Sequence, residues 1–217
     1  KKTGISSYEF RLSESISQNE LLNVIHEINR DERIHGLLML MPLPRKVNAR
    51  RVINALAPEK DVDGLGSISV GRLAADESTI QLFRQDTENM IQQLRMTPAA
   101  SSFLPCTPFG VIRLLEYYKV PIKGRHVVVV GKSLAVGKPL SMMLLAKEAT
   151  VTICHKETKD LGSMTRQADI LCTAAGRAGL ITGDMVKKGA VVVDVGINML
   201  ADGTMTGDVE FSSVSQQ

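Results

Sequence analysis

The sequence predicts an α/β fold, with a Rossmann-like, doubly wound parallel sheet preceded by a smaller α/β catalytic domain. Two observations in the C-terminal half favour this fold class. Residues 127–130 are four consecutive valines, typical of a buried parallel strand, and a glycine-containing turn follows them at once. Short apolar runs then recur about every twenty residues with weaker helical segments between them, which is the alternation typical of βαβ units.

The turn after this first strand has the spacing G-x-S-x-x-x-G, running from Gly131 to Gly137. Ser133 replaces the second glycine of a dinucleotide fingerprint, and Pro139 stands where a helix would begin. A strand, a glycine turn and a helix together direct backbone N–H groups at a phosphate. Taken alone, the turn fits a dinucleotide site and a purely structural connection about equally. A P-loop is excluded because His126 occupies the position of its first glycine.

Further strands are expected at residues 150–154, 169–173 and 190–194, and helical segments at residues 161–167 and 182–187. Doubly wound sheets bind ligands at the carboxyl ends of their strands. The residues expected at that edge are Gly131, His155, Gly176 and Gly196.

The residues after the second strand indicate which cofactor the site prefers. An NAD site places an Asp or Glu here for the ribose 2′-hydroxyl, whereas a 2′-phosphate requires cations. This chain has His155 and Lys156 at this point and Lys132 in the glycine turn, while Glu157 comes one residue late. NADP is therefore favoured over NAD. The alternative is that both lysines are ordinary solvated surface charges.

Composition limits the remaining classes of protein. The chain has 217 residues and a formal net charge of +3, which is too small to argue for nucleic acid. No apolar run is long enough to span a membrane. The N-terminus, Lys1-Lys-Thr-Gly4, has neither a starter Met nor a signal-peptide pattern, so the chain is expected to begin in mid-fold. The cysteines lack metal-ligand spacing, so we expect no metal site and three buried free thiols in a reducing compartment.

The N-terminal half begins with a capping box, Ser17-Gln-Asn-Glu20, which predicts the start of an amphipathic helix. Residues 34–41 read as a second buried strand, stopped by the prolines that follow. A helix is expected over residues 48–56. Residues 59–64 form a polar loop whose two aspartates could bind a cation or a ligand, or could simply be solvated.

A weak helical period covers residues 78–97, and a clear amphipathic helix runs from Thr107 to about Tyr118. We place the boundary between the two predicted domains near residues 105–108. The first domain then comprises residues 1–107 and the second residues 108–217.

Taken in order, these segments resemble the bifunctional methylenetetrahydrofolate dehydrogenase–cyclohydrolase family. The resemblance spans almost the whole chain and keeps the family's block order. The matching blocks are His35-Gly-Leu-Leu with Pro42-Leu43, Pro58-Glu-Lys-Asp-Val-Asp-Gly-Leu65, Gly71-Arg-Leu73, Pro105-Cys-Thr-Pro108, Gly131-Lys-Ser with Val136-Gly-Lys-Pro139, Ala149-Thr-Val-Thr with Cys154-His155, Gly189-Ala, Asp194-Val-Gly-Ile-Asn198 and Gly207-Asp-Val209.

The resemblance implies that the protein oxidises 5,10-methylenetetrahydrofolate with NADP and hydrolyses the methenyl product to 10-formyltetrahydrofolate. It implies that Asp63 is a catalytic-site carboxylate that anchors the pterin ring. It further implies a homodimer in the cytoplasm or mitochondrial matrix, with tetrahydrofolate derivatives as partners and neither nucleic acid nor a membrane. The implied substrate-binding residues are Met39, Leu40, Met41 and Asp63, and the implied cofactor-binding residues are Gly131, Lys132, Ser133, Gly137, His155, Lys156, Gly176 and Ile197.

The chain departs from the family pattern at several places. The family's Tyr-x-x-x-Lys motif, with its catalytic lysine, and its Pro-Gly-Gly-Val-Gly-Pro-Met-Thr block do not occur in these 217 residues. A glutamine that lies beside the catalytic lysine is replaced by Leu40, and a serine after Cys-His is replaced by Lys156. Residues 78–101 are longer than the family's usual connection.

These departures leave alternatives open. Because leucine can neither donate nor accept a hydrogen bond, Leu40 is expected to weaken hydrolysis. Leu40 could instead simply complete an apolar strand. A different class of function is a catalytically impaired relative that binds nucleotide or folate or serves as an oligomer partner. A Rossmann dehydrogenase for another substrate is the third reading, against which the block around Asp63 argues.

Overall fold

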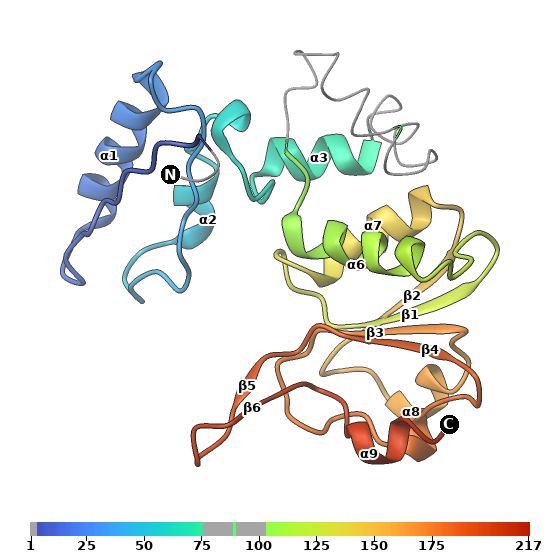
Figure 1. The fold of residues 1–217 in the computed structure, drawn as a ribbon. Helices are drawn as coiled ribbons and strands as arrows, with labels where there is room; N and C mark the ends of the chain where they lie inside the picture. The colour runs from blue at the N-terminus through green and yellow to red at the C-terminus, as the bar shows by residue number, and fades with distance from the viewer. Residues whose placement is uncertain (1–3, 76–88, 90–102) are drawn as a thin grey trace.

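The computed structural model describes residues 4–75, 89 and 103–217, and its centre is a four-stranded sheet. The strands are β1 (His126–Val130), β2 (Thr150–Cys154), β3 (Ile170–Thr173) and β4 (Val191–Asp194). All neighbouring pairs are parallel, and the order across the sheet is β2-β1-β3-β4 (Figure 1). The predicted Rossmann-like sheet is therefore confirmed, and each strand predicted for the C-terminal half is present within one residue of its expected start.

Helices cover both faces of this sheet, as Figure 1 shows. On one face lie α6 (Cys106–Tyr117) and α7 (Gly137–Ala146). On the other lie the short elements α8 (Leu161–Thr165), η2 (Gly183–Met185) and α9 (Phe211–Val214).

The side chains of β1 divide between two hydrophobic clusters. Val127 and Val129 pack with α6 and α7, whereas Val128 and Val130 pack with the elements on the opposite face. Successive side chains of a strand point to opposite faces, so a strand with apolar residues at every position suits a sheet covered on both sides.

Local details differ from expectation at three points. Helix α7 begins at Gly137, two residues before Pro139. The segment at residues 182–187 forms only the 3-10 turn η2 rather than a helix. The strands β5 (Asn198–Met199) and β6 (Met205–Thr206) form an antiparallel hairpin that the sequence did not suggest.

The N-terminal part contains α1 (Gln18–Arg30) and α2 (Ala49–Ile53), packed around a smaller core. The predicted capping box is confirmed: Glu20 donates its backbone N–H to Ser17 Oγ at 3.2 Å, and Ser17 donates its own to Glu20 Oε2 at 2.8 Å. Helix α2 is shorter than predicted. Its N-cap is Asn48, whose side chain accepts from the N–H of Arg51.

The prediction of a buried strand over residues 34–41 is wrong. Only Leu37 makes a parallel bridge, to Asp61, and within the described ranges no strand pairs along the rest of the segment. Leu37 and Met39 pack toward the core of α1 and α2, while Leu38 and Leu40 project outward, with Leu40 78% exposed. An apolar run favours extended backbone, but a strand also requires a hydrogen-bonding partner on its edge.

Two elements follow that the sequence did not suggest, η1 (Pro58–Lys60) and α3 (Ser67–Ala75). Leu73 of α3 is buried in the same core cluster as residues of α6 and α7. The segment before the predicted domain boundary thus packs directly on the sheet domain. The helical period predicted over residues 78–97, and the long connection at 78–101, lie almost wholly outside the described residues.

Candidate functional site

The carboxyl ends of β1 and β3 meet where the sheet order reverses, because β1 pairs with β2 on one side and with β3 on the other. The backbone there is tightly packed. Gly131 donates its N–H to the carbonyl of Cys154 at 2.8 Å, and Ala174 donates to the carbonyl of Val130 at 2.7 Å. In open α/β sheets this reversal point opens the crevice in which ligands bind.

Two glycines in the turn after β1 are required by close backbone contacts. Gly131 has φ +132°, and a Cβ there would collide with the carbonyl oxygen of Ala174. A Cβ at Gly137 would collide with the carbonyl oxygen of Gly131. The turn therefore folds back on itself, and only glycine fits at these two positions.

Ser133, in place of the usual second glycine, stabilises the start of α7. Its hydroxyl oxygen accepts from the N–H of Val136 at 3.1 Å and from that of Gly137 at 3.4 Å. The side chain thus meets donors that the first turn of a helix leaves without partners. Lys132 beside it is exposed, and no ion pair of Lys132 occurs within the described part of the chain.

The residues expected to select the cofactor lie just after β2. His155 is half-buried, and its Nδ1 accepts from the N–H of Glu157 at 3.2 Å, which leaves the proton of a neutral ring on Nε2. Lys156 pairs with Glu157 at 3.5 Å, and its side chain is 83% exposed. An ion pair this exposed contributes little to stability. Glu157 nevertheless offsets part of the positive charge that Lys156 would offer to a phosphate.

Gly176 and Ile197 lie on two loops at the same edge of the sheet. Gly176 is exposed with φ +65°, and Ile197 is 75% exposed just before β5. Sequence reasoning missed the two aspartates between these loops. Asp194, at the end of β4, accepts from Thr173 Oγ1 at 3.0 Å and from the N–H groups of Gly196 and Val209 at 2.9 Å each. A signal was present for Asp194, which ends an expected strand two residues before Gly196, whereas Asp208 follows Gly207 in a segment for which no strand was predicted.

In the N-terminal part, the loop at residues 59–64 is not simply solvated, because Lys60 and Asp61 are both buried. Lys60 Nζ donates to the carbonyls of Ile28, Asn29 and Asp31 at 2.7, 3.0 and 2.8 Å. These bonds satisfy carbonyl groups at the C-terminus of α1.

Asp61 holds the start of α3. It accepts from the N–H of Gly66 at 2.8 Å and from Ser69 Oγ at 2.9 Å. Lys60 and Asp61 are therefore structural residues, which leaves Asp63 as the aspartate of this loop that is open to a ligand.

Asp63 itself is partly exposed, and its carboxylate has no hydrogen bond within the described residues. Burial, and then the charge of Asp61, raise the pKa of Asp63 above its ordinary value. A donor that binds this carboxylate would oppose both effects and favour the ionised form.

Cys106, at the start of α6, adjoins Asp63. Its Sγ donates to the carbonyl of Val62 at 3.6 Å, and burial together with the charge of Asp63 raises the pKa of the thiol. Cys106 is exposed, so the prediction of three buried thiols is wrong at this position, while Cys154 and Cys172 are buried. The Asp63 loop thus lies against the beginning of the sheet domain.

Met39, Leu40 and Met41, three of the predicted substrate-binding residues, follow Leu37, which bonds to the Asp63 loop. Leu37 donates its N–H to the carbonyl of Lys60 at 2.8 Å. Further along, Met39 is half-buried against the core of α1 and α2, whereas Leu40 and Met41 are exposed. Leu40 therefore does not complete a buried strand, and its side chain is open to contact.

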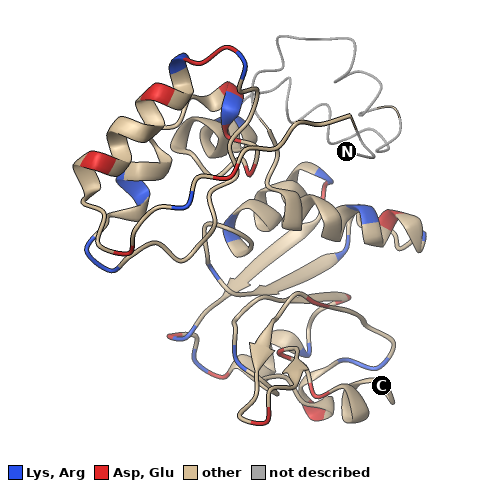
Figure 2. Cartoon of the chain, turned by 60° about the vertical axis from the view of Figure 1, so that its left-hand side comes forward, with Lys and Arg blue, Asp and Glu red and all other residues tan. Residues whose placement is uncertain are grey.

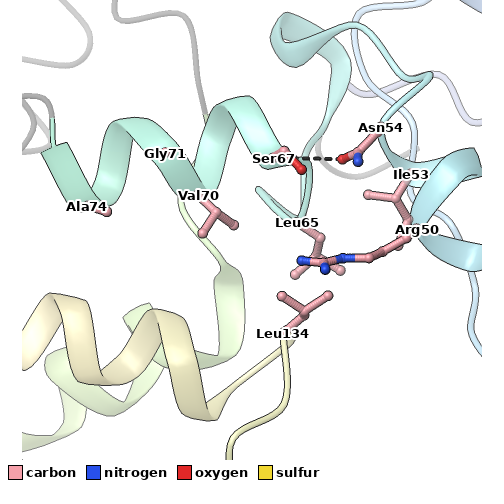
Figure 3. A pocket seen from close by; sticks show the side chains of 9 residues that line it. All are labelled: Arg50, Ile53, Asn54, Leu65, Ser67, Val70, Gly71, Ala74 and Leu134. Carbon is pink, nitrogen blue, oxygen red and sulfur yellow. Dashed lines mark hydrogen bonds between the residues drawn. The ribbon is translucent and has the colours of Figure 1, made fainter.

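A separate cavity of about 210 Å³ lies between α2, α3 and the glycine turn (Figure 3). The Arg50 side chain extends across it toward Leu134, and Ser67 donates its N–H to Asn54 Oδ1 at 2.9 Å on its rim. None of the predicted site residues lines this cavity. Its lining comprises Arg50, Ile53, Asn54, Leu65, Ser67, Val70, Gly71, Ala74 and Leu134.

Figure 2 shows acidic and basic residues interspersed along the described chain. Among these residues, no three His, Cys, Asp or Glu side chains are grouped so that they could hold a metal ion. The described helices also include none with the length and apolar character needed to cross a bilayer.

Comparison with known families decides the membership of the chain. The sequence model described as "Tetrahydrofolate dehydrogenase/cyclohydrolase, NAD(P)-binding domain" matches residues 105–217. The model described as "Tetrahydrofolate dehydrogenase/cyclohydrolase, catalytic domain" matches residues 1–63. The chain belongs to the tetrahydrofolate dehydrogenase/cyclohydrolase family. Asp63 is the last residue of the catalytic-domain match, and the sheet with its glycine turn lies wholly within the NAD(P)-binding match.

Individual relatives agree with this assignment. "Bifunctional protein FolD" of Exiguobacterium sibiricum is 47% identical over 216 residues, which cover 100% of this chain and 69% of that protein. The relative of the same name from Moorella thermoacetica is 45% identical over 217 residues, again covering 100% of this chain and 69% of the relative.

Solved structures of the family superpose well. The bifunctional FolD enzyme of Campylobacter jejuni has a TM-score of 0.79 and 42% identity, covering 94% of this chain and 64% of that one. The Trypanosoma brucei dehydrogenase-cyclohydrolase, complexed with NADP and an inhibitor, has a TM-score of 0.77 and 30% identity, covering 93% and 63%. The chain thus spans about two thirds of the length of the relatives it matches.

Proposed function

We propose that the protein oxidises 5,10-methylenetetrahydrofolate to the methenyl form with NADP, and hydrolyses the product to 10-formyltetrahydrofolate. The observation that carries this proposal is the turn after β1, in which Gly131 and Gly137 lack room for any side chain, within a matched NAD(P)-binding domain. A partly exposed carboxylate, Asp63, supplies a folate anchor in the matched catalytic domain. The proposal also includes the division of the chain into two domains, residues 1–107 and residues 108–217.

The residues present fit a dinucleotide cofactor. The tight turn from Gly131 to Gly137 joins β1 to the start of α7 in the strand–turn–helix arrangement that binds phosphates, and Lys132 is an exposed cation in the same turn. NADP, when bound, supplies the hydride acceptor. The protein's part in this step is mainly to hold the folate ring and the cofactor in contact and to exclude water.

Asp63 would hold the pterin edge, which presents adjacent N–H donors. A carboxylate accepts two parallel hydrogen bonds in this geometry, which fixes the face of the ring. In Asp63→Asn an amide donor would meet a ligand donor, so folate affinity should fall by roughly 2–4 kcal/mol while NADP affinity barely changes. Titration of both ligands is the measurement. Unchanged folate affinity would reduce Asp63 to a loop residue.

We further propose that NADP is preferred over NAD, since Lys132 and Lys156 offer positive charge to the 2′-phosphate. His155, Ser133, Gly176 and Ile197 complete the proposed cofactor site. The double variant Lys132→Ala/Lys156→Ala should bind both cofactors about equally, because NADP alone loses its extra contacts. Lys188→Ala is the matched control: this lysine is also exposed but precedes β4, at the opposite edge of the sheet. Equal affinities for the two cofactors in the unchanged protein would overturn the preference.

Hydrolysis is proposed to be the weaker activity because of Leu40. Water must attack the methenyl carbon with help from a polar group that moves a proton, which leucine cannot be. Met39 and Met41, on either side of Leu40, would contribute apolar contacts with the folate.

Leu40→Gln should raise hydrolysis by about 10²-fold in the full-length protein, within the usual range for positioned acid–base assistance. Because Leu40 is exposed, the substitution should leave stability nearly unchanged. Leu38→Gln is the control, since Leu38 is exposed two residues away. Methenyl and formyl products are followed separately. Efficient hydrolysis with Leu40 in place would contradict this assignment.

The second candidate function is a catalytically impaired relative that binds nucleotide or folate, and Leu40 is the observation that favours it. Ligand binding without either reaction in the full-length protein would support that alternative.

A homodimer is also proposed. Met199 and Met205 expose apolar side chains on the β5–β6 hairpin, and such patches commonly mark contacts between subunits. Sedimentation equilibrium of the full-length protein tests this. A cytoplasmic or mitochondrial-matrix location stays a prediction.

A further inference from the structure

The most deeply buried acid in the sheet domain is Asp208, which is 0% exposed. Its Oδ2 accepts from the N–H groups of Ala175 at 2.6 Å and Gly176 at 3.1 Å. Its Oδ1 accepts from the N–H of Arg177 at 2.8 Å and from Asn198 Nδ2 at 2.9 Å. A buried carboxylate is tolerable only when hydrogen bonds or a cation offset its lost hydration, and these four donors serve that purpose.

The four donors belong to two different loops. Three are consecutive backbone N–H groups at residues 175–177, just beyond the carboxyl end of β3. The fourth comes from Asn198, which directly follows Ile197 beyond the end of β4. One carboxylate therefore ties together the loops that carry Gly176 and Ile197.

Asp208 has little freedom to take another position. Its own N–H donates to Asp194 Oδ1 at 3.1 Å, and Asp194 in turn is held by Thr173 at the end of β3. A Cβ at Gly196 would collide with the carboxylate of Asp208, and one at Gly207 would collide with that of Asp194. Both acids are thus packed against bare backbone, so their positions are fixed by the ends of β3 and β4.

This arrangement reaches the glycine turn. Ala174, the residue before the three bound N–H groups, donates to Val130 at 2.7 Å, and its carbonyl packs where a side chain of Gly131 would otherwise lie. The path of the 174–177 loop is therefore set at one end by β1 and at the other by Asp208.

We propose that Asp208 is a positioning residue for the dinucleotide cofactor: it touches no ligand, but holds the 175–177 loop and the 196–198 segment in the conformation that binds. The inference rests on the proposed function, since it takes the cofactor to lie at this edge of the sheet. It adds a residue whose role is to shape the site through two loops at once.

The test compares Asp208→Asn with the unchanged full-length protein. The amide presents one oxygen in place of two, so at least one loop N–H loses its acceptor. We expect amide hydrogen exchange at residues 175–177 to accelerate about tenfold and the Kd of NADPH, measured by its fluorescence, to rise about tenfold. The KM for the folate substrate should change less than about twofold, because the Asp63 loop lies elsewhere.

Two further variants make the experiment decisive. Asp202→Asn is the matched control, because this acid of the β5–β6 turn is exposed and accepts only from Thr204. Asn198→Ala removes one donor and leaves the three backbone bonds. It should raise the Kd of NADPH by a smaller factor, and it carries the test if Asp208→Asn does not fold.

Each result then decides the inference. Faster exchange at 175–177 with weaker NADPH binding and an unchanged folate KM supports it. Normal NADPH binding in Asp208→Asn, or equal weakening of both ligands, overturns the positioning role alone. An unchanged protein that binds no NADPH overturns the proposed function and the inference with it.

Discussion

Asp61 and Asp208 are both buried aspartates whose carboxylates accept backbone N–H groups, yet they stabilise different kinds of structure. Asp61 accepts from residues four to eight positions further along the chain, so it closes a local turn at the start of α3. The backbone donors of Asp208 lie 31 to 33 positions away. The first acid builds a turn from its own neighbourhood, whereas the second joins segments that only the folded sheet brings together.

The contrast extends to the surroundings of each acid. Near Asp208, strand pairing fixes β1, β3 and β4, and close backbone contacts exclude side chains at several glycines. Near Asp61, the adjoining segment at residues 34–41 pairs only through Leu37. Cooperative packing should make the sheet edge less tolerant of change than the Asp61 loop. Three predictions test this difference, from the largest expected effect to the smallest.

Gly131→Ala should have the largest effect, because its Cβ meets the backbone of Ala174 and its φ of +132° is unfavourable for alanine. We expect a loss of about 3 kcal/mol in the free energy of unfolding, near the upper end of the usual range for overpacking. Gly110→Ala is the control: Gly110 lies inside α6, and apart from its chain neighbours and the backbone of its own helix no atom lies within 4 Å of the position of its added Cβ. It should be stabilising by about 0.5–1 kcal/mol. Urea unfolding measures the stability of both variants. If Gly131→Ala is as stable as Gly110→Ala, the turn after β1 can shift to make room for the added Cβ.

Lys60→Met should cost about 2 kcal/mol, the scale for losing hydrogen bonds from a buried charged group. Lys60 bonds to residues 29 to 32 positions back along the chain, so it is the long-range contact of the Asp61 loop. Lys187→Met is the control, because its pair with Asp169 at 2.6 Å is half-exposed and should contribute less than about 1 kcal/mol. Thermal unfolding of both variants gives the comparison. A negligible loss of stability in Lys60→Met would mean that water readily replaces the Lys60 ammonium as the donor to the carbonyls at the C-terminus of α1.

The smallest effect concerns the pH dependence of stability at Asp63. Its pKa is raised in the folded protein, chiefly by burial and then by Asp61, so folding favours the protonated acid. The stability that the protonated Asp63 contributes is fully present below its pKa in the unfolded chain, and it is lost as the pH rises through its pKa in the folded protein. At pH 7 Asp63→Asn should therefore be neutral or stabilising, by less than about 1 kcal/mol for a group this exposed.

This difference between Asp63→Asn and the unchanged protein should disappear in acid, below the pKa of an ordinary aspartate. Unfolding measured from pH 3 to pH 7 is the check. A variant that is clearly less stable at pH 7 would show that the ionised Asp63 stabilises the fold.

The sequence alone determined the features that depend on neighbouring residues. The four valines of β1, the turn from Gly131 to Gly137 and the capping box of α1 are all present as predicted. Each follows from a local periodicity or from a side chain that bonds to backbone three or four residues away. The family resemblance, carried by short blocks in a fixed order, was confirmed on the same basis.

Only the tertiary structure decided which segments find partners. Residues 34–41 have the composition of a strand, but strand pairing depends on a neighbouring edge that local sequence does not specify. Lys60 belongs to a predicted polar loop, yet it is buried at the C-terminus of α1, and Leu73, for which no helix was predicted, is buried in one core cluster with residues of α6 and α7. Asp208 likewise gains its role only because sheet formation brings residues 175–177 and Asn198 to its carboxylate. Burial and long-range hydrogen bonds are properties of the assembled chain, so periodicity and spacing cannot report them.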